Sequence, residues 1–392
     1  MLFQVLDNKA ECPALYTDEG LITDYDIDNL TKTWAPSLHI QKSGCDYAYI
    51  WAKGRPLEDT CPDAIKQEWD FINKRVAAFL KSFKNGKINL EETCLYDIIP
   101  EKSLLQFYNL KNKISNHVFD TCEKPVNHDF LADLYLCLKK IENQKLNLNF
   151  KNLDMSSESV RKTIAKIKGV PPHINYNLWG TVTGRLTTNR DSFPMLTLNK
   201  DLRSVIEPNN DCLLELDYNA AEIRVLLHLL GQKQPHGDIH AWISENIFDN
   251  KYSRDKTKKK VFAWLYNPKA KNKNLNSFLN RDALYDKYYK GGFVETPFGR
   301  KIKVSRDKAI NYLVQSAASD LFLTSAIKID KLLEKKKSSV YFCIHDSIVL
   351  DYAEEDRGIV DEIIKEFSDT KFGIFNTNLS MGRNFGAMRK IK

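Results

Sequence analysis

The eight cysteines of this sequence include no Cys-x-x-Cys pair, and no apolar run approaches the length of a membrane span. The first absence argues against a structural zinc site and against the disulfide framework of a secreted protein. The N-terminal letters MLFQV lack the basic segment and apolar stretch of a secretory signal. We therefore expect a protein of the reducing cytoplasm, with no membrane partner.

The apolar content suffices for two or three domains, since 43% of the 392 residues are hydrophobic and 11% are aromatic. The formal net charge is +7, and lysines cluster at residues 258–260 and 335–337. Local positive fields suit a polyanion such as nucleic acid, but a lysine-rich composition also arises from a biased genome. Charge alone leaves both interpretations open.

The hydrophobic pattern changes along the chain. Short β-like runs at residues 2–6 and 47–51 are followed by helical periodicity over 69–83, 104–118 and 130–141. A Gly-Val-Pro-Pro stretch then precedes a region of mixed strands and helices. The pattern predicts a largely helical first part and an α+β second part.

Four residues recur at every fourth position, so on a helix they share one slowly drifting face. In order they are two cations and two aromatics: Arg254, Lys258, Phe262 and Tyr266. Over roughly 18 Å such a face can meet the phosphates, sugar and base of a nucleoside triphosphate. The alternative is an amphipathic helix with a solvated basic side and two core aromatics.

Two aspartates stand at predicted strand ends. Asp217 closes an apolar run at 212–218 that precedes a helix at 220–230. Asp346 follows His345 between two apolar runs, which predicts a β-hairpin with this pair at its tip. Two such carboxylates can hold two divalent cations about 3.5 to 4 Å apart for phosphoryl transfer. Singly, each aspartate also suits an ordinary turn.

Five segments together resemble the family A (polymerase I-like) DNA polymerases over residues 179–385. They are the first metal-binding motif (216–224), the nucleotide-binding helix (254–266), the second metal-binding motif (345–346), and two DNA-contacting segments at 183–186 and 311–315. All five occur in the family's order, which makes the resemblance specific. It implies an α+β right hand with an antiparallel-sheet palm, helical fingers and a helical thumb.

The resemblance also implies roles for individual residues. Asp217 and Asp346 would bind two Mg²⁺ ions, for which Mn²⁺ can substitute, with the backbone carbonyl of Tyr218 as a further ligand. Lys258 would serve catalysis and, with Arg254 and His240, contact the triphosphate; for His240 a solvated loop position is the alternative. Phe262 would pack by the sugar and base, and Tyr266 near the template base. The DNA contacts would be Arg185, Arg203, Asn311, Gln315 and His345.

Glu222 distinguishes two kinds of polymerase. The related single-subunit RNA polymerases share the helix and the triplet His-Asp-Ser at residues 345–347, but carry a small residue five positions after the first aspartate. The bulk of Glu222 would exclude a ribose 2′-hydroxyl, so deoxynucleotides are the predicted substrate. Two departures from the family are Asn267, where glycine is usual, with Pro268 ending the helix, and Ser347, where glutamate is usual.

The predicted domains are an N-terminal region of open role (1–100), a short thumb (101–175), the palm (176–222 and 338–392) and the fingers (223–337). The first 100 residues contain no Asp-x-Glu strand, so we expect no 3′-to-5′ exonuclease. The expected function is DNA-directed DNA synthesis on primer-template DNA by a monomer, of a compact kind that suits a phage or other mobile replicon.

Further candidate partners are a separate exonuclease, a helicase and a processivity factor. A catalytically silent DNA-binding relic, a single-subunit RNA polymerase-like enzyme and a two-metal phosphodiesterase stay as alternatives. The relic would not need both metal carboxylates, and the phosphodiesterase would not need the four-residue ladder.

Overall fold

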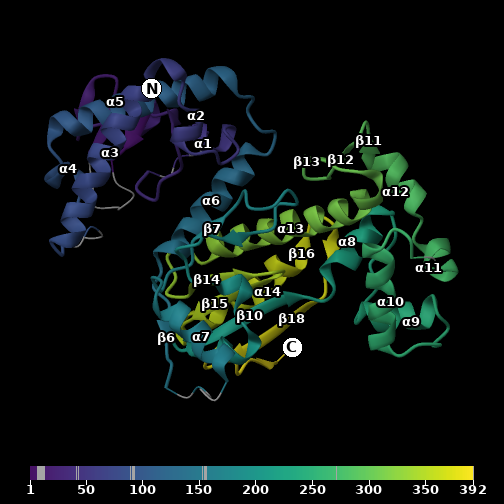
Figure 1. The fold of residues 1–392 in the computed structure, drawn as a ribbon. Helices are drawn as coiled ribbons and strands as arrows, with labels where there is room; N and C mark the ends of the chain where they lie inside the picture. The colour runs from purple at the N-terminus through teal and green to yellow at the C-terminus, as the bar shows by residue number, and fades with distance from the viewer. Residues whose placement is uncertain are drawn as a thin grey trace. The chain divides into compact units, whose positions relative to one another are not determined.

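The structure is a computed structural model that describes residues 1–6, 14–40, 42, 44–88, 90, 93–151, 153, 157–270 and 272–391. It divides into two compact units, Met1–Lys139 and Lys140–Lys392 (Figure 1). In the described ranges no helix is long and apolar enough to cross a membrane.

The first unit combines a small sheet with helices. Strands β1 (Phe3–Val5), β2 (Leu15–Thr17) and β3 (Gly20–Ile22) form an antiparallel meander, and β4 (Lys32–Thr33) pairs in parallel with β5 (Asp46–Tyr47). The helical elements are η1 (Ile27–Asn29), α1 (Ala48–Trp51), α2 (Leu57–Thr60), α3 (Asp63–Asn85), α4 (Leu95–Ile98), α5 (Glu101–Thr121) and α6 (His128–Asn143), the last of which runs into the second unit.

The three helices predicted from periodicity are confirmed as α3, α5 and α6. The β-like run at 47–51 was wrong beyond Tyr47, because residues 48–51 form α1. The predicted boundary at residue 100 does not coincide with the division of the units. Helix α5 shares a core with α3, in which Trp69 and Ile72 pack in one cluster with Ile114 and Val118.

The second unit is built on a five-stranded antiparallel sheet. Its order is β14 (Ser339–Ile344), β15 (Ser347–Tyr352), β10 (Cys212–Tyr218), β18 (Thr377–Gly382) and β19 (Arg389–Lys390). Helices α13 (Arg306–Leu332) and α14 (Val360–Ser368) pack against it (Figure 1). The buried Tyr218 marks this face, since its hydroxyl donates to Phe367 O at 2.6 Å and lies 2.8 Å from Ser325 Oγ. An antiparallel sheet with segregated helices is the α+β class expected from the sequence.

Four helices form a group beside this sheet (Figure 1): α9 (Ile239–Asn246), α10 (Arg254–Tyr266), α11 (Lys273–Phe278) and α12 (Arg281–Tyr288). Helix α8 (Ala221–Leu229) leads from β10 toward them. The remaining elements are β6 (Asn147–Leu148), α7 (Glu158–Lys168), β7 (Tyr176–Asn177), β8 (Thr187–Thr188), η2 (Met195–Thr197), η3 (Lys200–Val205), β9 (Ile206–Glu207), β11 (Tyr289–Lys290), β12 (Phe293–Glu295), β13 (Lys301–Lys303), η4 (Glu354–Ile359), β16 (Asp369–Thr370) and β17 (Gly373–Ile374).

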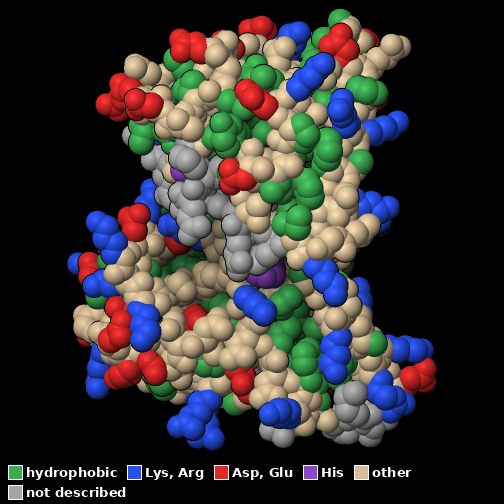
Figure 2. Space-filling model, turned by 90° about the vertical axis from the view of Figure 1, so that its left-hand side faces the viewer, with side chains coloured by type: hydrophobic (Ala, Val, Ile, Leu, Met, Phe, Trp, Pro, Cys, Tyr) green, Lys and Arg blue, Asp and Glu red, His purple; other side chains and the backbone are tan. Residues whose placement is uncertain are grey.

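Charged side chains are mixed on the surface. On the face drawn in Figure 2, lysine and arginine side chains are spread among acidic ones rather than gathered into a single patch. The modest net charge of +7 is therefore not concentrated on this face. The overall charge therefore indicates no binding face, and only particular groups of residues can indicate a function.

Candidate active site

Strand pairing brings Asp217 and Asp346 together. In the antiparallel register Asp217 lies opposite Ser347, and Ile344 also pairs with Ser347, which leaves His345 and Asp346 as the two-residue tip of the hairpin. The tip requires a left-handed backbone at His345, whose φ is 55°. The predicted hairpin is confirmed, and its tip stands at the end of the strand that carries the other aspartate.

The two carboxyl groups influence each other electrostatically. Burial, and after it the charge of Asp346, raises the pKa of Asp217 to about 7. Burial likewise raises the pKa of Asp346, while the positive charges of Arg185 and Lys258 act in the opposite direction. Lys258 also lowers the pKa of Asp217, so one cation of the ladder acts on both aspartates. Crowded carboxyl groups of this kind are typical of functional sites.

The donor set suits a hard divalent cation such as Mg²⁺, which prefers carboxylate and carbonyl oxygens. Among the described residues no group of three or more His, Cys, Asp or Glu side chains is arranged to hold a metal ion. Asp217 and Asp346 would supply the side-chain oxygens for such an ion. Tyr218 can add only its backbone carbonyl, because its side chain is buried against α13 and α14.

Asn378 is a neighbour of Asp217 that sequence reasoning missed. It lies opposite Asp217 on β18, and its side-chain nitrogen donates to Asp217 Oδ2 at 3.4 Å. Only the register between β10 and β18 places it there. A single sequence carries no signal for that pairing.

A cavity of about 720 Å³ opens at this end of the sheet. Its walls come from the 183–186 segment, η2, α8, α10, α13 and the hairpin tip. Six residues singled out from the sequence line it: Arg185, Glu222, Phe262, Tyr266, His345 and Asp346. Residues that are far apart in the chain thus share one cavity large enough for a nucleotide.

Glu222 is the centre of a polar network in this cavity. Its side chain pairs with Arg185 and accepts a hydrogen bond from the Tyr266 hydroxyl. Only 9% of Glu222 is exposed, so both partners hold it in place. Burial and the hydrogen bond to Glu222 raise the pKa of Tyr266, which stays a neutral donor. The carboxylate is thereby fixed as a wall of the cavity.

The ladder on α10 faces away from the core. Thr257, Val261, Trp264 and Leu265 are the buried side chains of this helix, whereas Tyr266 is 38% exposed. The rings of Phe262 and Tyr266 stack with centroids 5.7 Å apart, and Lys258 Nζ lies 5.9 Å from the Phe262 centroid. The alternative of two core aromatics does not describe this helix.

Arg254 and His240 extend the same surface. The Arg254 guanidinium donates to Asp238 Oδ2 at 2.9 and 2.7 Å. Burial opposes ionisation of Asp238, but hydrogen bonds from Arg254 and Ala241 hold its pKa at about 2. His240 lies in α9, only 3% exposed, so it is not a solvated loop residue.

The His240 ring is neutral and incompletely bonded. Burial lowers the pKa of His240 to about 4. Its Nδ1 has no hydrogen-bond partner in the described part of the chain. The ring centroid lies 6.0 Å from that of Phe262. A neutral imidazole thus lies buried beside the ladder rather than in solvent.

Two of the predicted DNA contacts follow each other on α13. Asn311 and Gln315 are one turn apart, and Gln315 is a hydrogen-bond partner of Tyr266. The buried Oδ1 of Asn311 finds no partner among the described residues. Arg203 stands apart from this group: it lies in η3 and its guanidinium packs 4.7 Å from the Phe385 ring centroid. The structure does not bring Arg203 to the cavity.

A buried ion pair supports the loop that carries Arg185. Arg300 donates to Asp320 at 2.6 and 3.1 Å, and Asp320 is fully buried. The Arg300 guanidinium lies so close to Gly184 that a Cβ there would come within 2.4 Å of it, and Gly184 has a φ of 76°. Ser319 also donates to Gly184 O at 3.0 Å. Glycine is therefore required, and the loop is fixed for Arg185 to reach Glu222.

The C-terminal end of α10 departs from the family pattern and is held by Arg281. Asn267 has a φ of −107°, so this position does not need the glycine that is usual in the family. Arg281 at the start of α12 donates to the backbone carbonyls of Trp264 and Pro268, the latter at 2.9 Å. Its guanidinium also lies 4.2 Å from the Trp264 ring centroid. Arg281 ties α10 to α12 where the two helices meet.

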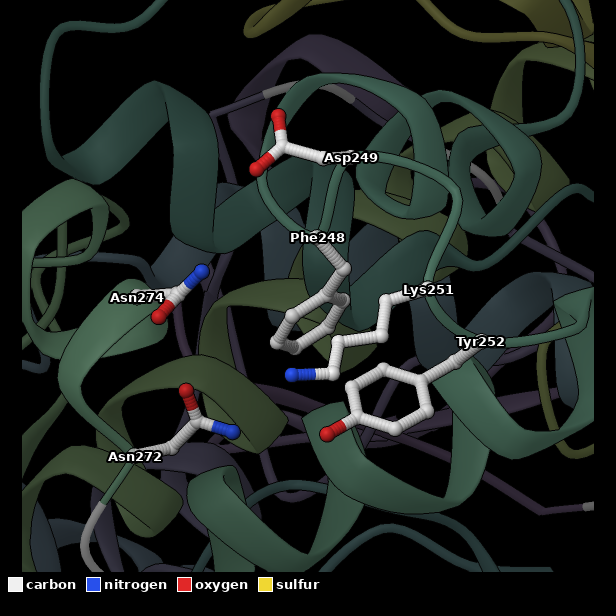
Figure 3. A pocket seen from close by; sticks show the side chains of 6 residues that line it. All are labelled: Phe248, Asp249, Lys251, Tyr252, Asn272 and Asn274. Atoms are coloured by element: carbon white, nitrogen blue, oxygen red, sulfur yellow. The ribbon is translucent and has the colours of Figure 1, made fainter.

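A second pocket of about 430 Å³ lies in the same helical group, and none of the predicted site residues lines it. In Figure 3 the Lys251 side chain points into it, between the rings of Phe248 and Tyr252 and the amides of Asn272 and Asn274. It is lined by one carboxylate, that of Asp249, whereas Glu222 and Asp346 both line the larger cavity. The candidate chemistry therefore belongs at the palm.

Comparison with known proteins finds DNA polymerases among the relatives of this chain. A DNA polymerase I of Caldicellulosiruptor bescii is 24% identical over 408 residues, covering 86% of this chain and 46% of that protein. The chain is a homologue of DNA polymerase I. The thermostable DNA polymerase I of Thermus aquaticus is 25% identical over half of the chain, and a DNA polymerase I of Lactococcus lactis is 27% identical over half of the chain.

The fold comparison agrees with this homology. The polymerase domain of Pol1 from M. smegmatis, solved with primer-template DNA and dNTP, matches with a TM-score of 0.62 at 12% identity, covering 98% of this chain and 95% of that one. The fold is that of a polymerase domain. No family model matches the sequence. The chain spans less than half the length of these three polymerase I relatives.

The raised pKa of Asp217 leads to a prediction about stability. The folded protein holds this proton up to about pH 7, whereas an unfolded carboxyl releases it near pH 4. The stability from this group is present below pH 4 and is lost as the pH rises to 7. Without metal, Asp217→Asn should therefore melt roughly 5 °C above wild type at pH 8, with a smaller gap at pH 5. Thermal melts in EDTA at both values would reveal this, and equal melting temperatures at pH 8 would contradict it.

Proposed function

We propose that this chain is a template-directed DNA polymerase that adds deoxynucleotides to a primer 3′ end. The observation that carries the proposal is the shared cavity, which joins the aspartate of the hairpin tip, the Glu222 network and the aromatic end of the α10 ladder. Homology to DNA polymerase I supports the same activity. Primer-template DNA and dNTPs are the proposed substrates.

The residues suit catalysis by positioning and electrostatics. Two Mg²⁺ ions held by Asp217 and Asp346 would supply the activation of the primer hydroxyl and neutralise the leaving phosphate. Arg254 and Lys258 would orient the triphosphate along α10. Phe262 and Tyr266 would place the sugar and base next to the cavity. No protein nucleophile is required.

The minor-groove contacts would test the shape of the base pair rather than its identity. Arg185 and His345 line the cavity and Gln315 bonds to Tyr266 in its lining, and Asn311, one turn before Gln315, would donate from its side-chain amide nitrogen. Minor-groove acceptors are similar in all base pairs, so such contacts can sense pairing without reading sequence.

The lack of proofreading is part of the proposal. It rests on the first 100 residues, in which we find no Asp-x-Glu strand. A 3′-mismatched primer incubated without nucleotides should stay intact. Shortening of the primer by both wild type and Asp217→Ala would contradict this, because the activity would then come from another site.

Primer extension on a defined template tests the proposal. We expect extension with the four dNTPs on a recessed primer, and none with an unprimed template or with Asp346→Ala. DNA binding without extension would instead favour the silent relic. Extension with ribonucleotides only would favour the RNA polymerase-like alternative, and cleavage of DNA without synthesis would favour the phosphodiesterase.

A further inference from the structure

One face of β10 carries a second carboxylate beside Asp217. Side chains alternate along a strand, so Glu215 and Asp217 share a face, while Leu214 and Leu216 point to the other. Both leucines are at most 1% exposed. Glu215 and Asp217 are both half-buried, so the face of the strand that carries their carboxylates is partly open.

Ser347 links this carboxylate to the hairpin. Its hydroxyl lies 3.0 Å from Glu215 Oε1 and 3.1 Å from Ile344 O. A hydroxyl has one proton to donate, and an ionised carboxylate is the stronger acceptor of the two. Ser347 is 4% exposed and lies opposite Asp217 in the register. The hydrogen bond therefore joins the strand of one metal aspartate to the residue that follows the other.

We propose that Glu215 is a positioning residue of the site, held by Ser347 so that its carboxylate orders the water shell of the metal ions. This inference rests on the proposed function. The described carboxylates do not form a three-residue metal cluster, so Glu215 acts on bound water rather than as a direct ligand. Such outer groups set the orientation and affinity of a metal site.

The arrangement also accounts for the serine after Asp346. At position 347 the resemblance leads one to expect glutamate, and here the hydroxyl of Ser347 meets a glutamate from the neighbouring strand instead. A carboxylate from β10 thus lies next to the residue that follows the hairpin tip, where the resemblance leads one to expect a carboxylate from the hairpin itself.

Mn²⁺ affinity tests this directly and needs no catalysis. Titrations of the full chain, followed by electron paramagnetic resonance, should give Glu215→Gln a Kd about tenfold above wild type. Glu207→Gln is the matched control, because Glu207 is a half-buried glutamate in β9 that accepts 2.8 Å from Asn149. It should leave the Kd unchanged. An unchanged Kd in Glu215→Gln would overturn the inference.

A double variant tests whether a glutamate at position 347 can take over the role of Glu215. Glu215→Gln combined with Ser347→Glu should restore the Kd to within about threefold of wild type, and a Kd no better than that of Glu215→Gln would overturn the exchange. If the double variant does not fold, Ser347→Ala decides. It should raise the Kd by releasing Glu215, and an unchanged Kd would overturn the role of the hydrogen bond. Because Mn²⁺ binding is read without primer extension, failure of the proposed polymerase activity would be seen separately.

Discussion

Asp346→Asn is expected to lower kcat for primer extension by about a thousandfold. The substitution removes the charge that would bind metal at the hairpin tip but keeps the shape of the side chain, and metal stabilisation of the transition state is worth several kcal/mol. Affinity for primer-template DNA should change by less than about twofold, since the carboxylate contributes no attraction to phosphate. Single-turnover extension and DNA-binding titrations would measure both.

The control for this loss is another aspartate of the same unit. Asp361 is exposed on α14, away from the cavity lining, and Asp361→Asn should leave both quantities unchanged. If the Asp346→Asn protein extends primers at more than a tenth of the wild-type rate, Asp346 is not a carboxylate on which metal binding and catalysis depend.

Glu222→Ala is expected to raise the relative efficiency of ribonucleotide insertion by roughly a hundredfold. The carboxylate is fixed by Arg185 and Tyr266 in the cavity wall, so it cannot swing aside for a 2′-hydroxyl. Removing it opens that space. The measurement is kcat/KM for a matched dNTP and rNTP opposite the same template base.

Glu222→Gln separates bulk from charge. Glutamine keeps the volume and can still accept from Tyr266, so discrimination against ribonucleotides should stay close to the wild-type value. If Glu222→Ala left discrimination unchanged, another group would have to exclude the ribose. If Glu222→Gln lost as much discrimination against ribonucleotides as Glu222→Ala, the charge of Glu222 rather than its size would exclude the ribose.

Local patterns made several elements predictable from the sequence. Two apolar runs around His345 and Asp346 predicted a hairpin, and spacing at every fourth position placed Arg254 and Tyr266 on one face of a helix. The short apolar run at residues 48–51 did not distinguish strand from helix, and these residues form helix α1.

Contacts between distant segments could not be predicted in this way. Asn378 reaches Asp217, and Glu215 meets Ser347, only through the register of the palm sheet. The hydrogen bond from Arg281 to the end of α10 joins residues 17 positions apart, which is beyond the reach of a local pattern. Helices α3 and α5 lie on either side of residue 100 and share a core that no local pattern reveals.

A crystal structure of the ternary complex would decide whether Asp217, Asp346 and the α10 ladder form the active site. It would contain a dideoxy-terminated primer on its template, the matching dNTP and Mg²⁺. We predict a triphosphate along Arg254 and Lys258, a base beside Tyr266, and two metal ions at about 2.0 to 2.1 Å from oxygens of Asp217 and Asp346. A nucleotide bound elsewhere, or bound without metal at these aspartates, would contradict the proposed active site.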